Sequence, residues 1–547
     1  MLQIVLKKLS DYYEGGNRWW LPIVSALLYP LCLPPFNKML HPVFTFFPLL
    51  GFVSLIPLFF FATRKPFKKA LFHTYLYCFT ICLAQYYWIG FVTAEGLWAV
   101  ILVGVVLIAL GMGLFYLLAA LLFRLLSRLL PRFYILIFPA VWVLVEYCRT
   151  LSDISFPWAL LGYSSTGLLP LAQFSSITGV WGLSFMIVFA NIFVWELLGS
   201  IRIKENIMQK VIHCAVMGSI LVAIAIWGSF RMQRDVTSEG TVKVSLLQSY
   251  MDQFNWTGNS LDSAFTISKE MVFNAALDKP DLIILPESAL LCYLDRRPEY
   301  RRKVLSWVQE TGVPLIAGAL HWDEAAKGSS QRYDVYNTAF LVTKGELIPY
   351  HKIMLVPFSE GMPFEAQFPI LSRVNLGEAD FKRGTEETLF NIGEKIEAAP
   401  YICYEIIYPS FVQRRLKEST NLLVNITNDG WFGKSSGPYQ HAAMAQMRAI
   451  ENGISLARSA NTGISMTVDP FGRVLQRSNL YVRTTLTGDL PRARIPTLYS
   501  KNGDWFISLC AFTVAIAVLL ALLFRRRPDG VITRPLLVEE QKLVPNH

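Results

Sequence analysis

Stretches of about 20 apolar residues recur along this chain, and they constrain its fold more strongly than any other feature. A helix needs about 20 such residues to cross the hydrocarbon core of a bilayer. The chain has 547 residues, is 53% hydrophobic and has a mean hydropathy of +0.39, which is high for a soluble protein. We therefore interpret the repeated stretches as membrane-spanning helices.

The pattern predicts eight spans, seven before residue 230 and one near the C-terminal end. The first contains Pro30, Pro34 and Pro35, which membrane helices tolerate only with local compensation. It lacks a small-residue cleavage site, so we expect it to remain as an anchor. The expected spans are residues 20–36, 45–63, 71–92, 98–122, 133–148, 178–199, 210–229 and 504–524.

Basic residues in the short loops predict the orientation of these spans. Lys and Arg precede the first span and follow the second, fourth, sixth and eighth, whereas the opposite loops hold little more than Lys38 and Arg149. By the positive-inside rule both termini face the cytoplasm and residues 230–503 lie outside it. The net charge of +10 then reflects topology. Nucleic-acid binding would need basic residues gathered on one soluble face, which the sequence does not indicate.

The chain is thus expected to have four parts. Residues 1–229 form a membrane domain with seven helices, 230–503 an outer domain, 504–524 the eighth helix and 525–547 a cytoplasmic tail. From Val242 onward, apolar strand-like runs alternate with amphipathic helical runs. This alternation predicts an α/β domain layered as a sandwich.

Three short motifs in the outer domain carry residues suited to covalent acyl transfer. They place Glu287 in LPES, Lys352 in HKIMLVPFSE and Cys403 in CYE. A free thiol is mostly protonated at neutral pH, so a catalytic cysteine needs a base or a positive neighbour. Glu287 is suited to be the base if burial raises its pKa, and Lys352 to stabilise an oxyanion. Cys403 ends a predicted strand, which suits an exposed nucleophile.

The same residues also allow purely structural interpretations. Cys403 could pair with Cys292 in a disulfide, because these two cysteines alone fall in the outer domain. Glu287 and Lys352 could form a structural ion pair, and so could Arg448 with a glutamate three residues later on a predicted helix. The fold-forming alternative also applies to Asn428, Asp429, Trp431 and His441.

The motifs LPES, HKxxLVPFxE, CYE and NDGWFG together resemble the carbon–nitrogen hydrolase, or nitrilase, superfamily. With the predicted spans, nearly the whole chain is similar to the apolipoprotein N-acyltransferase family. The resemblance implies an αββα sandwich on the periplasmic side of a bacterial inner membrane. It assigns Glu287 as proton acceptor, Lys352 as oxyanion stabiliser, Cys403 as nucleophile and Glu360 as a supporting carboxylate. Further matching positions are Tyr404, Glu405, Asn337 and Trp256.

The implied reaction has two steps and uses no metal or other cofactor. Cys403 takes an acyl chain from a phospholipid and passes it to the α-amine of a diacylglyceryl-cysteine at a lipoprotein N-terminus. The apolar loop 361–371 follows Glu360 and is expected to reach the lipid interface. Three alternatives stay open: a membrane-tethered amidase or nitrilase that hydrolyses its acyl-enzyme with water, a transporter with an outer binding domain, and an inactive scaffold.

Overall fold

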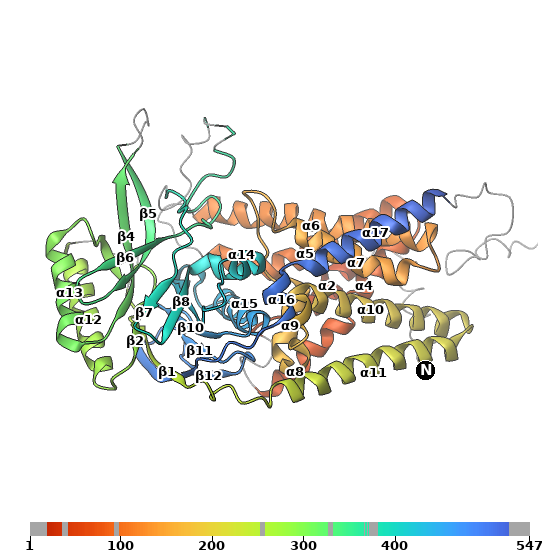
Figure 1. Cartoon of the computed structure of the whole chain (residues 1–547). Helices are drawn as coiled ribbons and strands as arrows, with labels where there is room; N and C mark the ends of the chain where they lie inside the picture. The colour runs from red at the N-terminus through yellow and green to blue at the C-terminus, as the bar shows by residue number, and fades with distance from the viewer. Residues whose placement is uncertain are drawn as a thin grey trace, which may run out of the picture.

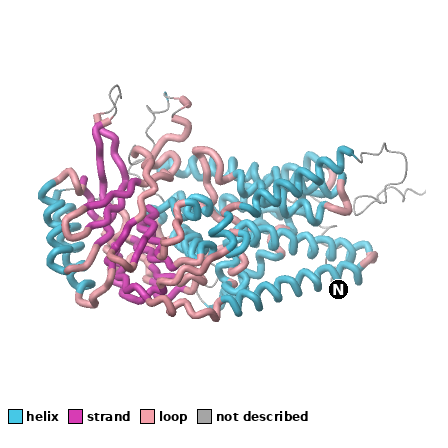
Figure 2. Tube along the Cα trace, viewed as in Figure 1, coloured by secondary structure: helices cyan, strands magenta, loops and turns pink. Residues whose placement is uncertain are grey.

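The computed structural model describes residues 19–35, 42–91, 98–251, 258–325, 332–365, 367, 368, 370 and 381–523. Figure 1 shows a helical body at one end of the molecule and a body built around β-strands at the other. Figure 2 shows the same division by secondary structure, with long helices gathered on one side and strands on the other. The chain enters the second body after the helical residues 207–231 and returns to the helical body through residues 505–523.

Helical segments occur at each of the eight predicted spans. Among the described residues, Ile101–Leu129 of α6, α10, α11 and α17 are long and apolar enough to cross a membrane, judged by length and composition. Trp20–Leu31, Phe47–Thr63 and Tyr134–Cys148 are shorter apolar helices. The helices are α2 (Trp20–Ala26), α3 (Leu28–Leu31), α4 (Ile56–Thr63), α5 (Phe67–Tyr86), α6 (Trp98–Leu129), α7 (Tyr134–Cys148), α10 (Val180–Ile203), α11 (Ile207–Arg231) and α17 (Trp505–Leu523).

Four of the predicted spans therefore correspond to helices that are long and apolar enough to cross a membrane, and all eight spans stay a prediction. The first predicted span differs most, because it consists of two short helices, α2 and α3, separated at Leu27. Pro22 and Pro30 lie in these helices, and a proline lacks the N–H that an uninterrupted helix needs.

Two sheets form the centre of the second body. The first sheet has seven strands in the order β13-β1-β2-β4-β5-β6, with β3 beside β4, and the second has six in the order β12-β11-β10-β9-β8-β7. The strands are β1 (Thr241–Gln248), β2 (Leu282–Ile284), β3 (Leu290–Tyr293), β4 (Leu315–Glu324), β5 (Tyr333–Val342), β6 (Leu347–His351), β7 (Phe390–Ile392), β8 (Ile396–Ile402), β9 (Leu422–Thr427), β10 (Ser455–Ala460), β11 (Met466–Val468), β12 (Val474–Arg477) and β13 (Thr484–Pro491).

A layer of apolar side chains from both sheets joins them face to face, including Leu246 and Ile316 from the first sheet and Ile402 and Val424 from the second. Helices α12 (Gly258–Ala276) and α13 (Pro298–Thr311) pack on the outer face of the first sheet. Helices α14 (Pro409–Arg414) and α15 (Gly437–Asn452) cover the second sheet. The predicted layered α/β sandwich is thus confirmed, with the layers helix, sheet, sheet, helix.

The two bodies share one continuous core. Buried residues of α15 belong to the same apolar cluster as those of α5, α7 and α10. Trp158 of the helical body donates its indole N–H to Gln440 at 2.7 Å, and the backbone N–H of Val180 donates to Glu451 at 2.9 Å. The second sheet therefore faces the helical body across α15.

Candidate active site

Glu287 lies in the turn between β2 and β3, at the inner side of the first sheet. It is 6% exposed. Its two carboxylate oxygens accept hydrogen bonds from the Asn337 side-chain amide and from the backbone N–H of Asn428, each at 2.8 Å. Burial raises the pKa of Glu287, although the positive charge of Lys352 opposes the rise. A carboxyl with a raised pKa is a stronger base than a solvated one.

The turn around Glu287 lies so close to β4 that only glycine fits opposite it. A Cβ on Gly318 would lie 2.6 Å from the Cα of Glu287, well inside van der Waals contact. The absence of a side chain at Gly318 therefore sets how closely the Glu287 turn packs on the sheet.

Lys352 follows β6 and reaches the same point. Its Nζ lies 3.5 Å from Glu287 Oε1 and 2.7 Å from Glu360 Oε1, and the side chain is 1% exposed. Burial alone would lower the pKa of Lys352, but the carboxylates of Glu360 and Glu287 outweigh it and raise that pKa. The ammonium group is therefore charged at neutral pH. Glu360 is fixed in turn by the backbone N–H of Val356 at 2.9 Å.

Cys403 is the first residue after β8 and begins the short helical turn η5 (Cys403–Ile407). Its φ of 50° lies in the left-handed region, which is uncommon for a residue with a side chain and occurs at strained functional turns. Cys403 is a free thiol, as is Cys292, so the disulfide alternative is wrong for this structure. Burial and the charge of Glu287 raise the pKa of the Cys403 thiol, and Lys352 opposes them. The charges of Glu287 and Lys352 therefore both act on the Cys403 thiol.

Glu405 connects the two sheets behind the site. One oxygen accepts the backbone N–H groups of Ile353 at 2.7 Å and Met354 at 3.2 Å, and also the hydroxyl of Tyr350 at 2.8 Å. The other accepts the N–H of Ile402 at 2.7 Å. Glu405 therefore holds the chain next to Lys352 against the chain next to Cys403, and it is fully buried.

Tyr404 ties the cysteine turn to the helical body. Its hydroxyl donates to the backbone carbonyl of Ser155 at 2.9 Å, and its ring stacks on Phe156 with ring centroids 6.4 Å apart. Trp256, the remaining predicted residue, lies outside the described residues.

A buried ionic cluster lies under the cysteine turn and contains Asp429 and His441, two of the residues for which the sequence allowed a fold-forming role. His441 Nε2 donates to the backbone carbonyl of Cys403 at 3.1 Å, and His441 Nδ1 lies 2.9 Å from Asp429. Arg458 donates to Asp429 at 2.7 Å. Burial would raise the pKa of Asp429, but Arg458 and His441 lower it to about 2. An arginine inside the apolar strand SLARSA was the sequence signal for this cluster, because a buried guanidinium requires an anionic partner.

Two family models match the chain, one for each body. Residues 244–498 match the carbon–nitrogen hydrolase family, and residues 25–193 match the apolipoprotein N-acyltransferase N-terminal domain. The sandwich that contains Glu287, Lys352 and Cys403 is thus a carbon–nitrogen hydrolase domain.

Curated relatives cover most of the chain. An apolipoprotein N-acyltransferase from Geobacter metallireducens is 33% identical over 394 residues, covering 71% of this chain and 74% of the relative. That from Haemophilus influenzae is 30% identical over 531 residues, covering 96% and 98%. An amidase of the nitrilase superfamily from Nesterenkonia AN1 is a similar solved structure, with 18% identity, a TM-score of 0.36, and coverage of 49% of this chain and 96% of the amidase. The chain belongs to the apolipoprotein N-acyltransferase family, and it is an enzyme of that family.

Proposed function

We propose that this enzyme transfers an acyl chain from a phospholipid to the α-amine of a diacylglyceryl-cysteine at the N-terminus of a lipoprotein. The observation that carries the proposal is the buried Lys352 ammonium between Glu287 and Glu360, electrostatically coupled to the Cys403 thiol. Family membership and the apolar helices support the lipid substrates. Cys403 is the nucleophile, Glu287 the proton acceptor and Lys352 the oxyanion stabiliser.

In the first step, Glu287 accepts the proton of the Cys403 thiol and the sulfur attacks the ester carbonyl carbon of the phospholipid. The carbonyl oxygen becomes an oxyanion, which the Lys352 ammonium stabilises. The C–O bond breaks, the departing alkoxide takes the proton from Glu287, and a lysophospholipid leaves a thioester on Cys403. Glu360 holds Lys352 in place throughout, because its carboxylate is the nearer of the two.

In the second step, the lipoprotein amine attacks the thioester carbonyl. An α-amino group has a pKa of about 7.7–8.0, so a useful fraction is unprotonated at neutral pH. Glu287 accepts the proton of the attacking amine, and the sulfur leaves as the C–S bond breaks. The departing thiolate then takes the proton from Glu287, which restores the free thiol and the Glu287 carboxylate, and the product is an amide. Asn337 and Glu405 position Glu287 and the cysteine turn through the hydrogen bonds described above.

The membrane arrangement is part of the proposal. Eight spans with both termini in the cytoplasm of a bacterium place residues 230–503 on the periplasmic side of the inner membrane, with residues 1–229 and 504–524 in the bilayer and 525–547 as a tail. The basic short loops and the outward-facing apolar side chains of α6, α11 and α17 support it.

The apolar loop after Glu360 is suited to admit lipid. Phe368 and Ile370 of this loop are exposed. The backbone N–H of Phe364 donates to Asp153 of the helical body at 3.0 Å, so the described part of this loop lies beside the helical body. Residues 366, 369 and 371 of the predicted loop lie outside the described residues.

Intact-mass spectrometry of the full-length protein after incubation with phospholipid tests the mechanism. We expect an added acyl mass that hydroxylamine removes and that Cys403→Ala does not acquire. Addition of a diacylglyceryl lipopeptide should then yield acylated lipopeptide. Free fatty acid as the main product would instead support the alternative of a membrane-tethered amidase or nitrilase. Absence of the adduct on the unaltered protein, with product still formed, would contradict the thioester.

The pH dependence of single-turnover acylation tests Glu287 separately. Glu287 must be ionised to accept the thiol proton, and its pKa is raised by burial. The rate should therefore fall about tenfold per pH unit once the pH drops below that raised pKa. In Glu287→Gln this acidic limb should disappear along with most of the rate.

A further inference from the structure

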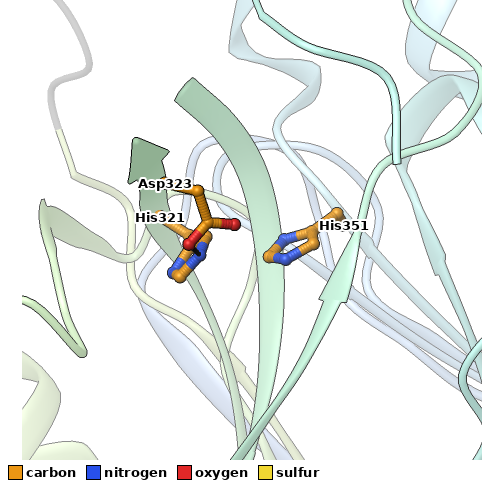
Figure 3. Close-up of side chains that lie close together, drawn as sticks. All are labelled: His321, Asp323 and His351. Carbon is orange, nitrogen blue, oxygen red and sulfur yellow. Dashed lines mark ion pairs between the residues drawn. The ribbon is translucent and has the colours of Figure 1, made fainter. Parts of the chain in front are cut away.

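A second group of ionisable side chains lies on the opposite face of the sheet that carries Lys352. His321 and Asp323 come from β4, and His351 ends β6 (Figure 3). We call these three residues the outer-face cluster. Strand alternation separates it from the acyl site: Asn337 and Thr338 are successive residues of β5, and successive side chains point to opposite faces. Asn337 contacts Glu287, whereas Thr338 contacts His351.

The spacing of the cluster is that of ligands around one ion. One ligand atom from each residue lies within 4.8 Å of the other two. His321 Nε2 and Asp323 Oδ1 are 3.1 Å apart. Two ligands bound to one tetrahedral zinc ion at about 2.0–2.1 Å lie roughly 3.3 Å from each other. The pair on β4 already has a spacing close to this value, and His351 lies within 4.8 Å of both.

Each imidazole is also anchored through its other nitrogen. His321 Nδ1 lies 2.7 Å from Asp295 Oδ2, and His351 Nδ1 lies 2.9 Å from the hydroxyl of Thr338. Such contacts fix the ring orientation of metal-binding histidines and leave Nε2 as the ligand atom. Two histidines and a carboxylate brought together from β4 and β6 are a built arrangement, because β4, β5 and β6 must keep their register to produce it.

Charge around the cluster favours a cation. Asp295 and Asp323 contribute two negative charges, and Arg296, 2.5 Å from Asp323, contributes one positive charge. With neutral imidazoles the sum is negative. Asp323 is 48% exposed at its side chain, so an ion can enter from solvent.

A protonated His321 between two aspartates is the competing explanation. It accounts for Asp295 and Asp323 but leaves His351 outside these ion pairs. The imidazole rings of His321 and His351 stack with centroids 4.7 Å apart. The ring of Tyr336 also stacks on His351, with centroids 4.5 Å apart. A metal ion uses all three members of the outer-face cluster.

We propose that His321, Asp323 and His351 bind one divalent transition-metal ion of the zinc type, with Asp295 and Thr338 orienting the two imidazoles. The ion would join β4 to β6 across β5. Because His351 directly precedes Lys352, the ion would fix the end of the strand that positions the lysine. Its role is structural, since it lies on the face of the sheet away from Glu287.

Zinc binding to the untagged full-length protein in detergent micelles tests the site. The protein is stripped with EDTA, freed of chelator, and titrated with Zn²⁺ against a chromogenic chelator, with Mg²⁺ as the comparison ion. We expect one saturable Zn²⁺ per chain and no competition from equal Mg²⁺, because Mg²⁺ prefers an all-oxygen shell. His351→Gln and Asp323→Asn should each weaken Zn²⁺ binding at least about tenfold, and Asp295→Asn about tenfold.

Matched variants separate this site from other sources of binding. His213→Gln, on α11, should leave Zn²⁺ affinity unchanged, and so should Cys403→Ala, which abolishes acyl transfer without touching the cluster. The visible spectrum of Co²⁺ bound to the unaltered protein gives a readout that needs no variant, with the intense bands of a four-coordinate nitrogen–oxygen site. Equal Zn²⁺ affinity in the unaltered protein and His351→Gln, meaning an adventitious ion only, would overturn the proposal. So would absence of one saturable site.

Discussion

The helices that cover the two sheets differ in what lies beyond them. Helix α13, on the first sheet, buries Val304, Trp307 and Val308 and exposes most of its charged residues, as expected for a helix with solvent on one side. In α15, on the second sheet, every residue except Tyr439 is buried. The helical body thus takes the place that water has on the other side of the sandwich.

This difference shows that the helical body is a structural part of the catalytic domain. Four alanines of α15, at 442, 443, 445 and 449, allow close packing on both sides of the helix. Its charged residues form an ion pair within the helix: Arg448 Nε lies 2.9 Å from Glu451, and both side chains are fully buried. The cysteine turn rests on the same layer, because His441 of α15 donates to the Cys403 carbonyl.

The largest expected effect comes from the proposed nucleophile on the second sheet. Cys403→Ala should lower the rate of lipopeptide acylation by about a thousandfold or more, since it removes the sulfur that we propose carries the acyl chain. The rate is measured with phospholipid vesicles and a fluorescent lipopeptide. Thermal unfolding should stay within a few degrees of the unaltered protein. If Cys403→Ala acylated the lipopeptide at a rate close to that of the unaltered protein, the chemistry would not depend on the cysteine at the end of the second sheet.

The next effect tests the burial of α15. Arg448→Met removes the partner of a fully buried carboxylate and should lower the free energy of unfolding by about 3–5 kcal/mol, measured by denaturant titration in detergent. The double variant Arg448→Met with Glu451→Leu is the control, because it removes both charges. Its free energy of unfolding should be closer to that of the unaltered protein than the value for Arg448→Met alone. A loss below about 1 kcal/mol for the single variant would show that α15 is solvated like α13.

Lys352→Met tests the contribution of the first sheet, because Lys352 directly follows β6. Loss of an oxyanion donor should raise the barrier to acylation by about 2.7–4 kcal/mol, a rate decrease of roughly 10²–10³. Because the methionine also leaves Glu287 and Glu360 without a buried cation, the pH profile should shift upward. Pre-steady-state appearance of the acyl-enzyme measures this step alone. An unchanged acylation rate would assign Lys352 to the structural ion pair.

A smaller effect is expected at the contact between the cysteine turn and the helical body. Tyr404→Phe removes one hydrogen bond to the Ser155 carbonyl and should cost about 1 kcal/mol of stability. Tyr408→Phe is a matched control, because the Tyr408 hydroxyl contacts the same carbonyl at 3.0 Å. The two variants together should cost more than their sum, since the carbonyl is then left buried. If the stability losses of the two single variants simply add in the double variant, water replaces the two lost hydroxyl groups at the Ser155 carbonyl.

The smallest effect is expected on the solvent side. Arg302→Ala, at an exposed position of α13, should change the free energy of unfolding by less than about 0.5 kcal/mol and leave acylation unchanged. The same denaturant titration measures it. A loss as large as that of Arg448→Met would remove the distinction between the two helices.

Much of the fold follows from hydrophobic pattern alone. The apolar stretches located the helical segments, and the alternation after Val242 located most strands. Strand β13 was not predicted, because Gly488 and Pro491 weaken its sequence signal. It exists through pairing with β1 along the whole of Thr241–Gln248, which is a tertiary effect.

The proposed site was predicted as residue types in motifs, whereas its supporting contacts depend on folding. Nothing local indicates that Arg458 meets Asp429, or that Glu405 reaches residues 353 and 354, because these partners are far apart in the sequence. Sequence periodicity predicted α15 as a helix, but it did not predict that its Gln, His and Arg side chains are buried. These side chains form buried contacts, for example Gln440 with Trp158.

Glu405 has a consequence for how the enzyme can accommodate a bulky chain. One carboxylate clamps the segments after both β6 and β8, so the lysine and the cysteine cannot drift apart without breaking several charge-assisted hydrogen bonds at once. Space for the fatty chain must then come from elsewhere. When a fatty chain binds or leaves, Lys352 and Cys403 should therefore keep their positions, and the side chains that face the lipid should move. Any strain from binding the chain would then arise outside the reacting groups.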